Sequence, residues 1–460
     1  MELPRPLPFF AVLAVFVGCM PPAPSPRYKG ALKSAGEAEQ DRPALGRAGE
    51  RQPLPADLTG PRPVEVFIER AFRENRKLQA ERYRLSAMKE RVPQATALDD
   101  PRVQNTVRPF PNYGPQYSMM GYMPYSLMLS QGLPWFGTLA IRGEKAESEV
   151  KVAEAELRAA ELKVIAEVKQ AYYELYYSER ATEVLSESRA AALSLVSLAK
   201  DRYTTGAAGQ GDVFRAELSV SDLDRELESA REGTAVARAM LAEAIHVSPD
   251  AELHSLPTIS LPDVPEDREQ LIRLAKKNRP ELEQRRAALA SDERDVELAR
   301  KKYFPDIELG LTYDLMTTDH AASDMADGKD NYGFLVGFTL PLYRSKLDAA
   351  LREAEARAVA DGRRFDAERD ETARLVTALF AKVRARHELV SLLRRTILPK
   401  ASDSQAAARN DYVAGTTPFA SALAAWQEEL RFRLELARME ADLGSAIAEL
   451  EAAVGGTFGQ

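Results

Sequence analysis

Residues 126–147 read SLMLSQGLPWFGTLAIRGEKAE, and residues 334–354 read FLVGFTLPLYRSKLDAALREA. In both stretches apolar residues alternate with small or polar ones, and the alternation ends near a Leu-Pro pair. An amphipathic pattern with helical spacing follows. Alternation with a period of two predicts a β-strand, and the longer period predicts an α-helix. The same passage from strand to helix therefore occurs twice in this chain.

Two further pairs of segments match in the same order, about 205 residues apart. They are AFRENRKLQ (71–79) with AKKNRPELE (275–283), and AKDRYTTGAAGQGDVFRAEL (199–218) with ARNDYVAGTTPFASALAAWQ (408–427). A period this long indicates a duplicated half-protein rather than a solenoid. We therefore expect two similar repeats, residues 63–262 and 263–460.

The composition excludes several functional classes. The net charge of −8 argues against a nucleic-acid partner, because a surface that neutralises phosphates should be basic. The 25 glycines form no phosphate-binding loop, and abundant carboxylates without a pocket signal give no support for acid–base catalysis. We therefore expect neither an enzyme nor a bound cofactor or metal. The possible metal ligands are better interpreted as structural, surface, loop or lipid-facing residues; they are His246, His254, His320, His387, Met119, Met120, Met123 and Met128.

The N-terminus indicates export. An apolar run, residues 7–17 (LPFFAVLAVFV), ends at Gly18-Cys19. Cys19 is the only cysteine, so it cannot form an internal disulfide. This end resembles a bacterial lipoprotein signal, which implies a signal peptide over residues 1–18 and lipid attachment at Cys19; an ordinary secretory signal is the alternative. We expect residues 19–62, rich in proline and charge, to be a flexible tether.

The repeats predict long helices with a small β part. Strands are expected near residues 102–108, 125–133, 306–313 and 332–340. Residues 137–203 contain no proline and predict one helix roughly 100 Å long. Other helices are expected at residues 63–92, 212–247, 266–303, 347–397 and 419–454.

Four strands are too few for a membrane barrel of a single chain. An open four-stranded sheet leaves two edges whose backbone groups have no partner in lipid. The smallest membrane barrels have about eight strands. Several chains must therefore contribute strands if this sheet lies in a membrane.

The duplicated halves, the strand ending in Leu-Pro and the Tyr-x-x-Gly segments at 203–206 and 412–415 resemble the TolC-type outer-membrane efflux channels. The resemblance implies a homotrimer with a 12-stranded β-barrel continuous with a periplasmic α-helical barrel. It implies a passive duct, joined to a periplasmic adaptor and an inner-membrane pump. Residues 131–137 (QGLPWFG) look most like members that serve resistance-nodulation-division pumps. Alternatives are the exit duct of type I protein secretion and a lipid-anchored periplasmic coiled-coil scaffold without a pore.

The resemblance places the adaptor contacts at two turns between helices. The positions that match the family's contact segments are Thr205-Gly206-Ala207 and Ala414-Gly415-Thr416. A tight turn between helices favours a residue that tolerates positive φ, which gives the glycines a physical reason. The alternative interpretation is that they only cap the helices.

The resemblance also implies a gate. Family members close the tip with a hydrogen bond between a tyrosine and an aspartate, and Tyr412 and Asp212 stand at the matching positions. The alternative is that Tyr203 and Tyr412 only pack the seams between helices. The chain departs from the family's pattern at Thr417, where an arginine is expected, and at Ser421 and Ala424, where aspartates are expected. Acidic residues close by that could supply other lumenal charge are Asp201, Asp403 and Asp411.

Overall fold

The computed structural model describes residues 24–32, 58–108, 122–318, 325 and 327–458. The chain divides into two compact units, Met1–Pro53 and Leu54–Gln460. In the first unit, residues 26–32 form a short helix. The predictions for the signal peptide and for Cys19, and those for Met119, Met120 and His320, fall outside the described residues.

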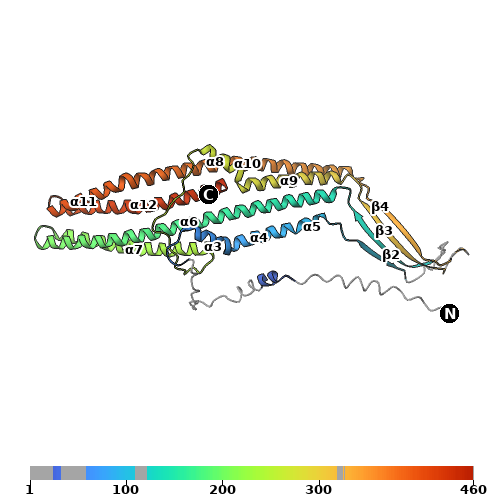
Figure 1. Cartoon of the computed structure of the whole chain (residues 1–460), viewed down its shortest axis with the longest axis horizontal. Helices are drawn as coiled ribbons and strands as arrows, with labels where there is room; N and C mark the ends of the chain where they lie inside the picture. The colour runs from blue at the N-terminus through green and yellow to red at the C-terminus, as the bar shows by residue number, and fades with distance from the viewer. Residues whose placement is uncertain (1–23, 33–57, 109–121, 319–324, 326, 459–460) are drawn as a thin grey trace. The chain divides into compact units, whose positions relative to one another are not determined.

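The first half of the second unit contains three short helices, two strands and two long helices (Figure 1). They are α3 (Val64–Glu74), α4 (Arg76–Lys89), α5 (Arg91–Thr96), β1 (Arg102–Val107), β2 (Tyr122–Leu133), α6 (Thr138–Thr204) and α7 (Gln210–Ile245). Helix α6 has 67 residues, and this confirms the single long helix that its proline-free sequence predicted. At 1.5 Å per residue it is roughly 100 Å long.

The second half repeats this order. Its elements are α8 (Arg268–Asn278), α9 (Pro280–Lys301), β3 (Ile307–Thr317), β4 (Asn331–Phe338), α10 (Arg344–Leu392), the π-helix η3 (Leu393–Ile397), α11 (Leu398–Ala414) and α12 (Phe419–Val454). The fold is thus mainly α with a small β part, in two similar halves, as the sequence predicted.

Both halves break their first helix at the same place in the repeat, where we expected helix throughout. Asn75 and Arg279 are extended, with φ and ψ of −64° and 114° and of −66° and 120°. Asn75 accepts hydrogen bonds from the N–H groups of Lys77 and Leu78 and so caps α4. Arg279 precedes Pro280, and a residue before proline is disfavoured in the helical conformation. Different residues therefore produce one backbone geometry.

A π-helical turn interrupts the long helix of the second half. Pro399 lies just after η3, in the first turn of α11. Proline has no N–H to donate and its ring crowds the preceding turn, so a regular α-helix cannot continue through it unchanged. One wide turn accommodates the defect. The first half has an unbroken α6 at this level.

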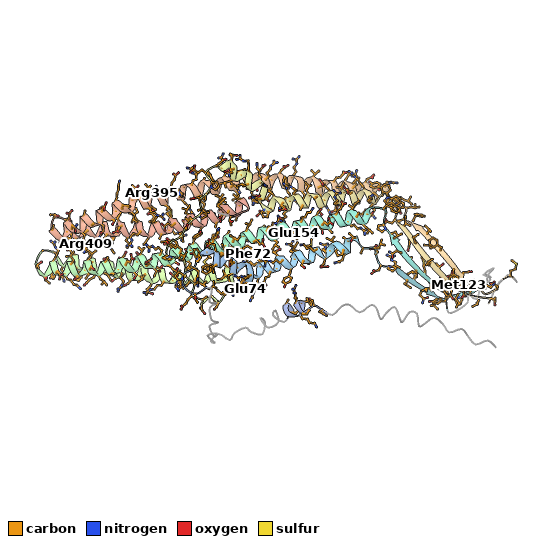
Figure 2. The ribbon with its side chains drawn as sticks, in the orientation of Figure 1. Phe72, Glu74, Met123, Glu154, Arg395 and Arg409 are labelled. Carbon is orange, nitrogen blue, oxygen red and sulfur yellow. The ribbon has the colours of Figure 1, made fainter. Side chains whose placement is uncertain are left out.

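The four strands form one antiparallel sheet in the order β1-β2-β3-β4, so β1 and β4 are its edges. Met123 (Figure 2) and Met128 lie in β2. Residues that face one another across all four strands are Val103, Leu129, Leu311 and Phe334. Their side chains are 44–69% exposed. The opposite face carries mainly small or polar residues, with Met128 and Leu335 as apolar exceptions. On it the Ser126 hydroxyl donates a hydrogen bond to Asp314 at 2.6 Å.

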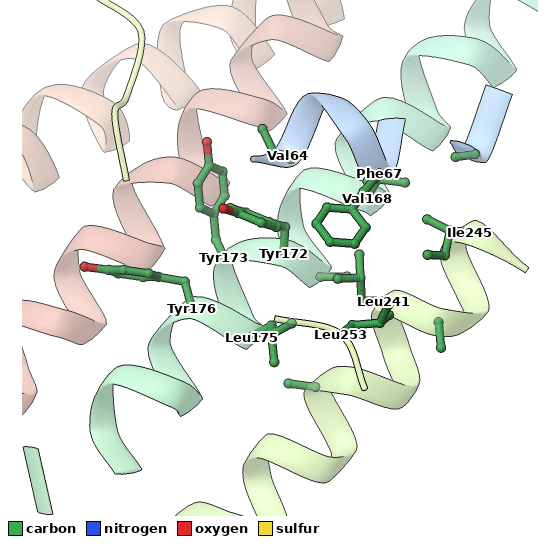
Figure 3. Close-up of a cluster of buried hydrophobic side chains, with 14 of the residues drawn as sticks. Val64, Phe67, Val168, Tyr172, Tyr173, Leu175, Tyr176, Leu241, Ile245 and Leu253 are labelled. Carbon is green, nitrogen blue, oxygen red and sulfur yellow. The ribbon is translucent and has the colours of Figure 1, made fainter. Parts of the chain in front are cut away.

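The largest buried cluster joins α3 to α6 and α7 (Figure 3). Phe67 packs against Tyr172 with ring centroids 5.7 Å apart. The Tyr172 hydroxyl donates to the carbonyl of Arg62 and accepts from the N–H of Leu256, both at 3.0 Å. Leu58 is fully buried in this cluster. The packed structure therefore begins before residue 63, where we expected the first repeat to start.

The halves contact each other along α6, which packs against α9 and α12 of the second half as well as against α7. Glu440 of α12 accepts hydrogen bonds from the Tyr176 hydroxyl of α6 at 2.7 Å and from Arg394 of η3 at 2.6 Å. Among the described residues, none of the helices has the length and apolar character needed to cross a membrane.

Candidate functional site

The predicted site residues lie at two turns between helices, which we call the first tip (residues 201–213) and the second tip (residues 410–420). The first tip joins α6 to α7, and the second joins α11 to α12. Both turns pass through a left-handed glycine, Gly206 with φ of 73° and Gly415 with φ of 78°. Each glycine therefore occupies a conformation that other residues adopt only with strain.

The two tips have the same backbone hydrogen bonds. At the first tip the N–H of Gly206 donates to Tyr203 at 3.0 Å, and that of Ala207 donates to Arg202 at 2.8 Å. At the second tip Gly415 donates to Tyr412 and Thr416 donates to Asp411, both at 3.0 Å. These are the two bonds of a Schellman motif, which satisfies the last carbonyls of a helix. Equivalent residues of the two repeats thus make the same individual backbone hydrogen bonds.

The two tyrosines of the repeat have different surroundings. Tyr203 is 47% exposed, whereas Tyr412 is 2% exposed. The Tyr412 ring meets the Phe419 ring edge-on, with centroids 5.3 Å apart. It belongs to a buried cluster drawn from α6, α7, α11 and α12 that also includes Val196 and Val213. Tyr412 therefore packs between the two tips, whereas Tyr203 is not part of this cluster; whether Tyr412 only packs here or also gates the channel stays a prediction.

The predicted gate pair lies close together without a direct bond. The pKa of Tyr412 is raised, first by burial and then by the nearby carboxylate of Asp212, while Arg202 opposes the shift. The Tyr412 hydroxyl has no hydrogen-bond partner among the described residues. Asp212 instead lies 3.8 Å from the guanidinium of Arg215. A gate formed by Asp212 and Tyr412 stays a prediction for the assembled protein.

The other predicted contact residues are on the surface. Thr205, Ala207, Ala414 and Thr416 are exposed. The hydroxyls of Thr205 and Thr416 bond back to carbonyls of their own helices, at 3.0 and 2.9 Å. All of them are free to meet a partner, and adaptor contact stays a prediction.

The positions that depart from the family's pattern also lie at or near the second tip. The Thr417 hydroxyl is buried and has no partner among the described residues. Ser421 and Ala424 are exposed, as are the acidic residues Asp403 and Asp411 of α11 and Asp201 of the first tip.

Arg202 is a residue of this site that the sequence interpretation missed. Its guanidinium bonds to the carbonyl oxygens of Tyr412 and Val413 in the second tip. The available signal was a difference between the repeats, because Arg202 precedes Tyr203 where Asp411 precedes Tyr412. The two halves are alike in backbone here but opposite in charge.

A second polar cluster, remote from the tips, fixes a connecting segment. Glu179 of α6 accepts from His254 at 2.8 Å, from Arg238 at 3.2 Å, and from the N–H of Ser255 at 2.9 Å. These contacts anchor the segment after α7 to the helices. Among the described residues, no three His, Cys, Asp or Glu side chains are grouped so that they could hold a metal ion.

Comparison with known proteins defines the class to which this fold belongs. The family described as outer membrane efflux protein matches residues 67–245 and 271–456, one segment in each half. That match covers most of the chain. The chain therefore belongs to the outer membrane efflux protein family, which consists of channels rather than enzymes.

Particular relatives agree with this assignment. Protein CyaE of Bordetella pertussis is 30% identical over 149 residues, an alignment that covers 32% of this chain and only 31% of CyaE. The structure of the outer-membrane channel OprN is similar with a TM-score of 0.72 at 19% identity, covering 86% of this chain and 90% of OprN. The structure of the outer membrane protein VceC of Vibrio cholerae is similar with a TM-score of 0.72 at 19% identity, covering 86% of this chain and 96% of VceC. At these identities the two structures support the fold.

Proposed function

We propose that three copies of this chain form an outer-membrane channel, the passive exit duct of a tripartite efflux system. A periplasmic adaptor and an inner-membrane pump would deliver drugs or heavy-metal ions to it. The twelve strands of the trimer would close one barrel in the outer membrane, and the long helices would extend into the periplasm as a helical barrel. Residues 63–262 and 263–460 would be the two repeats of each chain.

The observation that carries this proposal is the apolar face of the sheet. Val103, Leu129, Leu311 and Phe334 form a row across all four strands and remain exposed in the single chain. Contiguous apolar surface of this kind is costly in water and favourable in lipid. The open edges β1 and β4 have unpaired backbone groups, which must find partners before the sheet can enter a bilayer. Neighbouring copies of the chain would supply them.

The N-terminus would attach the channel to lipid. We propose cleavage of residues 1–18 and acylation of Cys19, with the following residues as a tether. The support is the apolar run that ends at the chain's single cysteine. Mass spectrometry of the intact protein from outer membranes should show the acyl mass, and a Cys19→Ala protein should lack it.

The tips would contact the adaptor. The exposed segments 205–207 and 414–416 are related by the repeat and have one backbone geometry, so a trimer would present six near-equivalent turns. Co-purification of adaptor and pump with the full-length protein tests this. Replacing Gly206 and Gly415 by bulky residues should abolish adaptor capture and resistance. Gly209→Leu is the matched control, because Gly209 lies in the same turn with an ordinary φ of −85° and open space around it.

Fractionation tests the duct itself. The proposal predicts a heat-resistant trimer in outer membranes with a β component in its circular dichroism. Val103→Lys should reduce the amount of trimer, because a lysine in the lipid-facing row costs about 2–4 kcal/mol near the bilayer middle. Gln104→Lys, on the opposite face of the same strand, should not. A wholly helical protein that leaves membranes without detergent would instead indicate a periplasmic scaffold, and co-purification of a type I secretion pump would indicate a different cargo.

A further inference from the structure

We propose that Arg202 holds the second tip onto the first within each chain and thereby keeps the tips of the channel shut. The shut channel belongs to the proposed function, so the inference rests on it. The contact between the tips is a property of the single chain and can be measured separately.

The first support is the set of hydrogen bonds that Arg202 makes. One nitrogen of its guanidinium, Nη1, donates to the carbonyl oxygens of Tyr412 and of Val413, the latter at 2.8 Å. Both carbonyls belong to the last turn of α11. The C-terminal end of a helix carries partial negative charge, which a guanidinium complements. A side chain of α6 therefore stabilises the end of a helix from the other half of the protein.

The second support is the packing of the guanidinium on an aromatic ring. The Arg202 guanidinium carbon lies 4.8 Å from the centre of the Tyr412 ring. That ring is buried against Phe419 and is held in place by the cluster between the tips. Cation–π contacts of this kind strengthen when they are removed from water. The arginine is thus fixed both by hydrogen bonds and by a rigid surface.

The third support is that each chain has only one such arginine. The repeat position that holds Arg202 in the first half holds Asp411 in the second, and a carboxylate cannot donate to carbonyl oxygens. Arg202 of the first tip therefore donates to the second tip, and Asp411 at the equivalent position cannot make the reciprocal bond. Gly415 leaves room for it, since a Cβ atom there would lie 3.2 Å from Nη2 of Arg202.

These contacts must break if α11 and α12 move away from α6 and α7 at the tips. Nη1 of Arg202 joins the turn of one helical hairpin to the helix end of the other, and no other hydrogen bond or ion pair does so between the residues of the two tips that the structure describes. Separation of the hairpins would expose the Tyr412 ring and leave the α11 carbonyls to water. Arg202 is therefore a positioning residue whose loss should loosen the second tip.

Amide hydrogen exchange of the full-length protein in detergent tests the contact without requiring transport. In Arg202→Ala, exchange at residues 409–417 should become faster by at least about tenfold, since bonds to a charged donor are among the stronger ones. Arg202→Lys should show most of this change, because lysine keeps the charge but lacks the planar guanidinium that packs on the Tyr412 ring while Nη1 reaches the two carbonyl oxygens. The matched control is Arg409→Ala, an exposed arginine on α11 that forms no ion pair with the described residues (Figure 2). Unchanged exchange in a folded Arg202→Ala protein would overturn the proposal.

Conductance across planar bilayers tests the consequence for the channel. Arg202→Ala and Arg202→Lys should increase the time spent in the conducting state by severalfold, while Arg409→Ala should behave like the wild type. Faster exchange without any change in conductance would overturn the claim that this contact keeps the tips shut. If wild-type trimers form no pore at all, the proposed function fails, and the exchange experiment still decides whether Arg202 joins the tips.

Discussion

The two tips share one backbone and differ in the side chains that contact each other across it. Both end a long helix with a Schellman motif around a left-handed glycine. At the first tip the tyrosine is half exposed and the preceding residue is Arg202, whereas at the second Tyr412 is buried and the preceding residue is Asp411. The comparison shows that the duplicated sequence specifies the turn, while its differences specify how the two turns are joined.

The largest difference in stability between the two tips is expected when their tyrosines are truncated to alanine. Tyr412→Ala should cost about 3–5 kcal/mol of local stability, because it empties a buried site between four helices. Tyr203→Ala should cost less than about 1 kcal/mol, as is usual for surface substitutions. Thermal unfolding followed by circular dichroism, together with limited proteolysis at the tips, measures both. Equal effects of the two substitutions would remove the distinction between the tips.

Substitution of the two tip glycines should show a smaller difference in stability between the tips. An L-residue in the left-handed conformation costs about 1–2 kcal/mol, so Gly206→Ala and Gly415→Ala should both destabilise. The second should be worse, because a Cβ at Gly415 crowds Arg202 at 3.2 Å, while nothing lies within 4 Å at Gly206. Proteolytic cleavage rates at the two tips measure the difference. A more damaging substitution at Gly206 would contradict the role given to Arg202.

A pair of carboxyl groups in the second half, away from the tips, gives a prediction about pH. Burial, and then a hydrogen bond and charge repulsion from Asp361 of α10, raise the pKa of Asp292 in α9 from 3.8 to about 6. Asp295 adds to this effect, and Lys145 of α6 opposes it. The same hydrogen bond, with Arg364 and Arg285 nearby, lowers the pKa of Asp361.

The direction in which stability changes with pH follows from the raised pKa of Asp292. The folded state holds this proton more tightly than the unfolded state, so its stabilising effect is present at low pH and is lost as pH rises from about 4 through about 6. Asp292→Asn should therefore be more stable than the wild type at neutral pH, by about 1 kcal/mol once solvent screening is considered, with a gap that closes toward pH 4. Thermal unfolding across this pH range measures it. If the difference in stability between Asp292→Asn and the wild type does not change with pH, the two carboxyl groups do not share a proton.

The smallest expected effect distinguishes the two interpretations of Tyr412. If its hydroxyl remains without a partner, Tyr412→Phe should raise stability by about 1 kcal/mol, because it removes a buried hydroxyl that has no hydrogen bond, and should leave conductance unchanged. If Asp212 bonds to that hydroxyl in the assembled channel, Tyr412→Phe should raise conductance, and Asp212→Asn should do the same. Single-channel recording therefore decides between a gate and a packed seam.

Much of the fold could be predicted from the sequence because its signals are long. The absence of proline before Tyr203 predicted α6, and strict alternation at residues 306–313 predicted β3. The breaks at Asn75 and Arg279 depend on a single capping residue or on the residue before a proline, and they were missed. A long periodic pattern conceals such local events.

The contacts at the tips were harder to predict, for a different reason. Sequence comparison aligned Tyr203 with Tyr412, but which of the two is buried depends on how the hairpins pack against each other. Arg202 reaches a helix end 210 residues away along the chain, and no periodicity reports such a contact. The only trace in the sequence was the exchange of an arginine for an aspartate between the repeats.

Single-channel conductance of the protein purified from outer membranes tests the central claim most directly. We expect that trimers insert into planar bilayers, are mostly shut, and open for longer when Arg202 is replaced by alanine. If the outer-membrane protein never conducts, in the wild type or in the Arg202→Ala variant, this chain is not a channel that is shut at its tips.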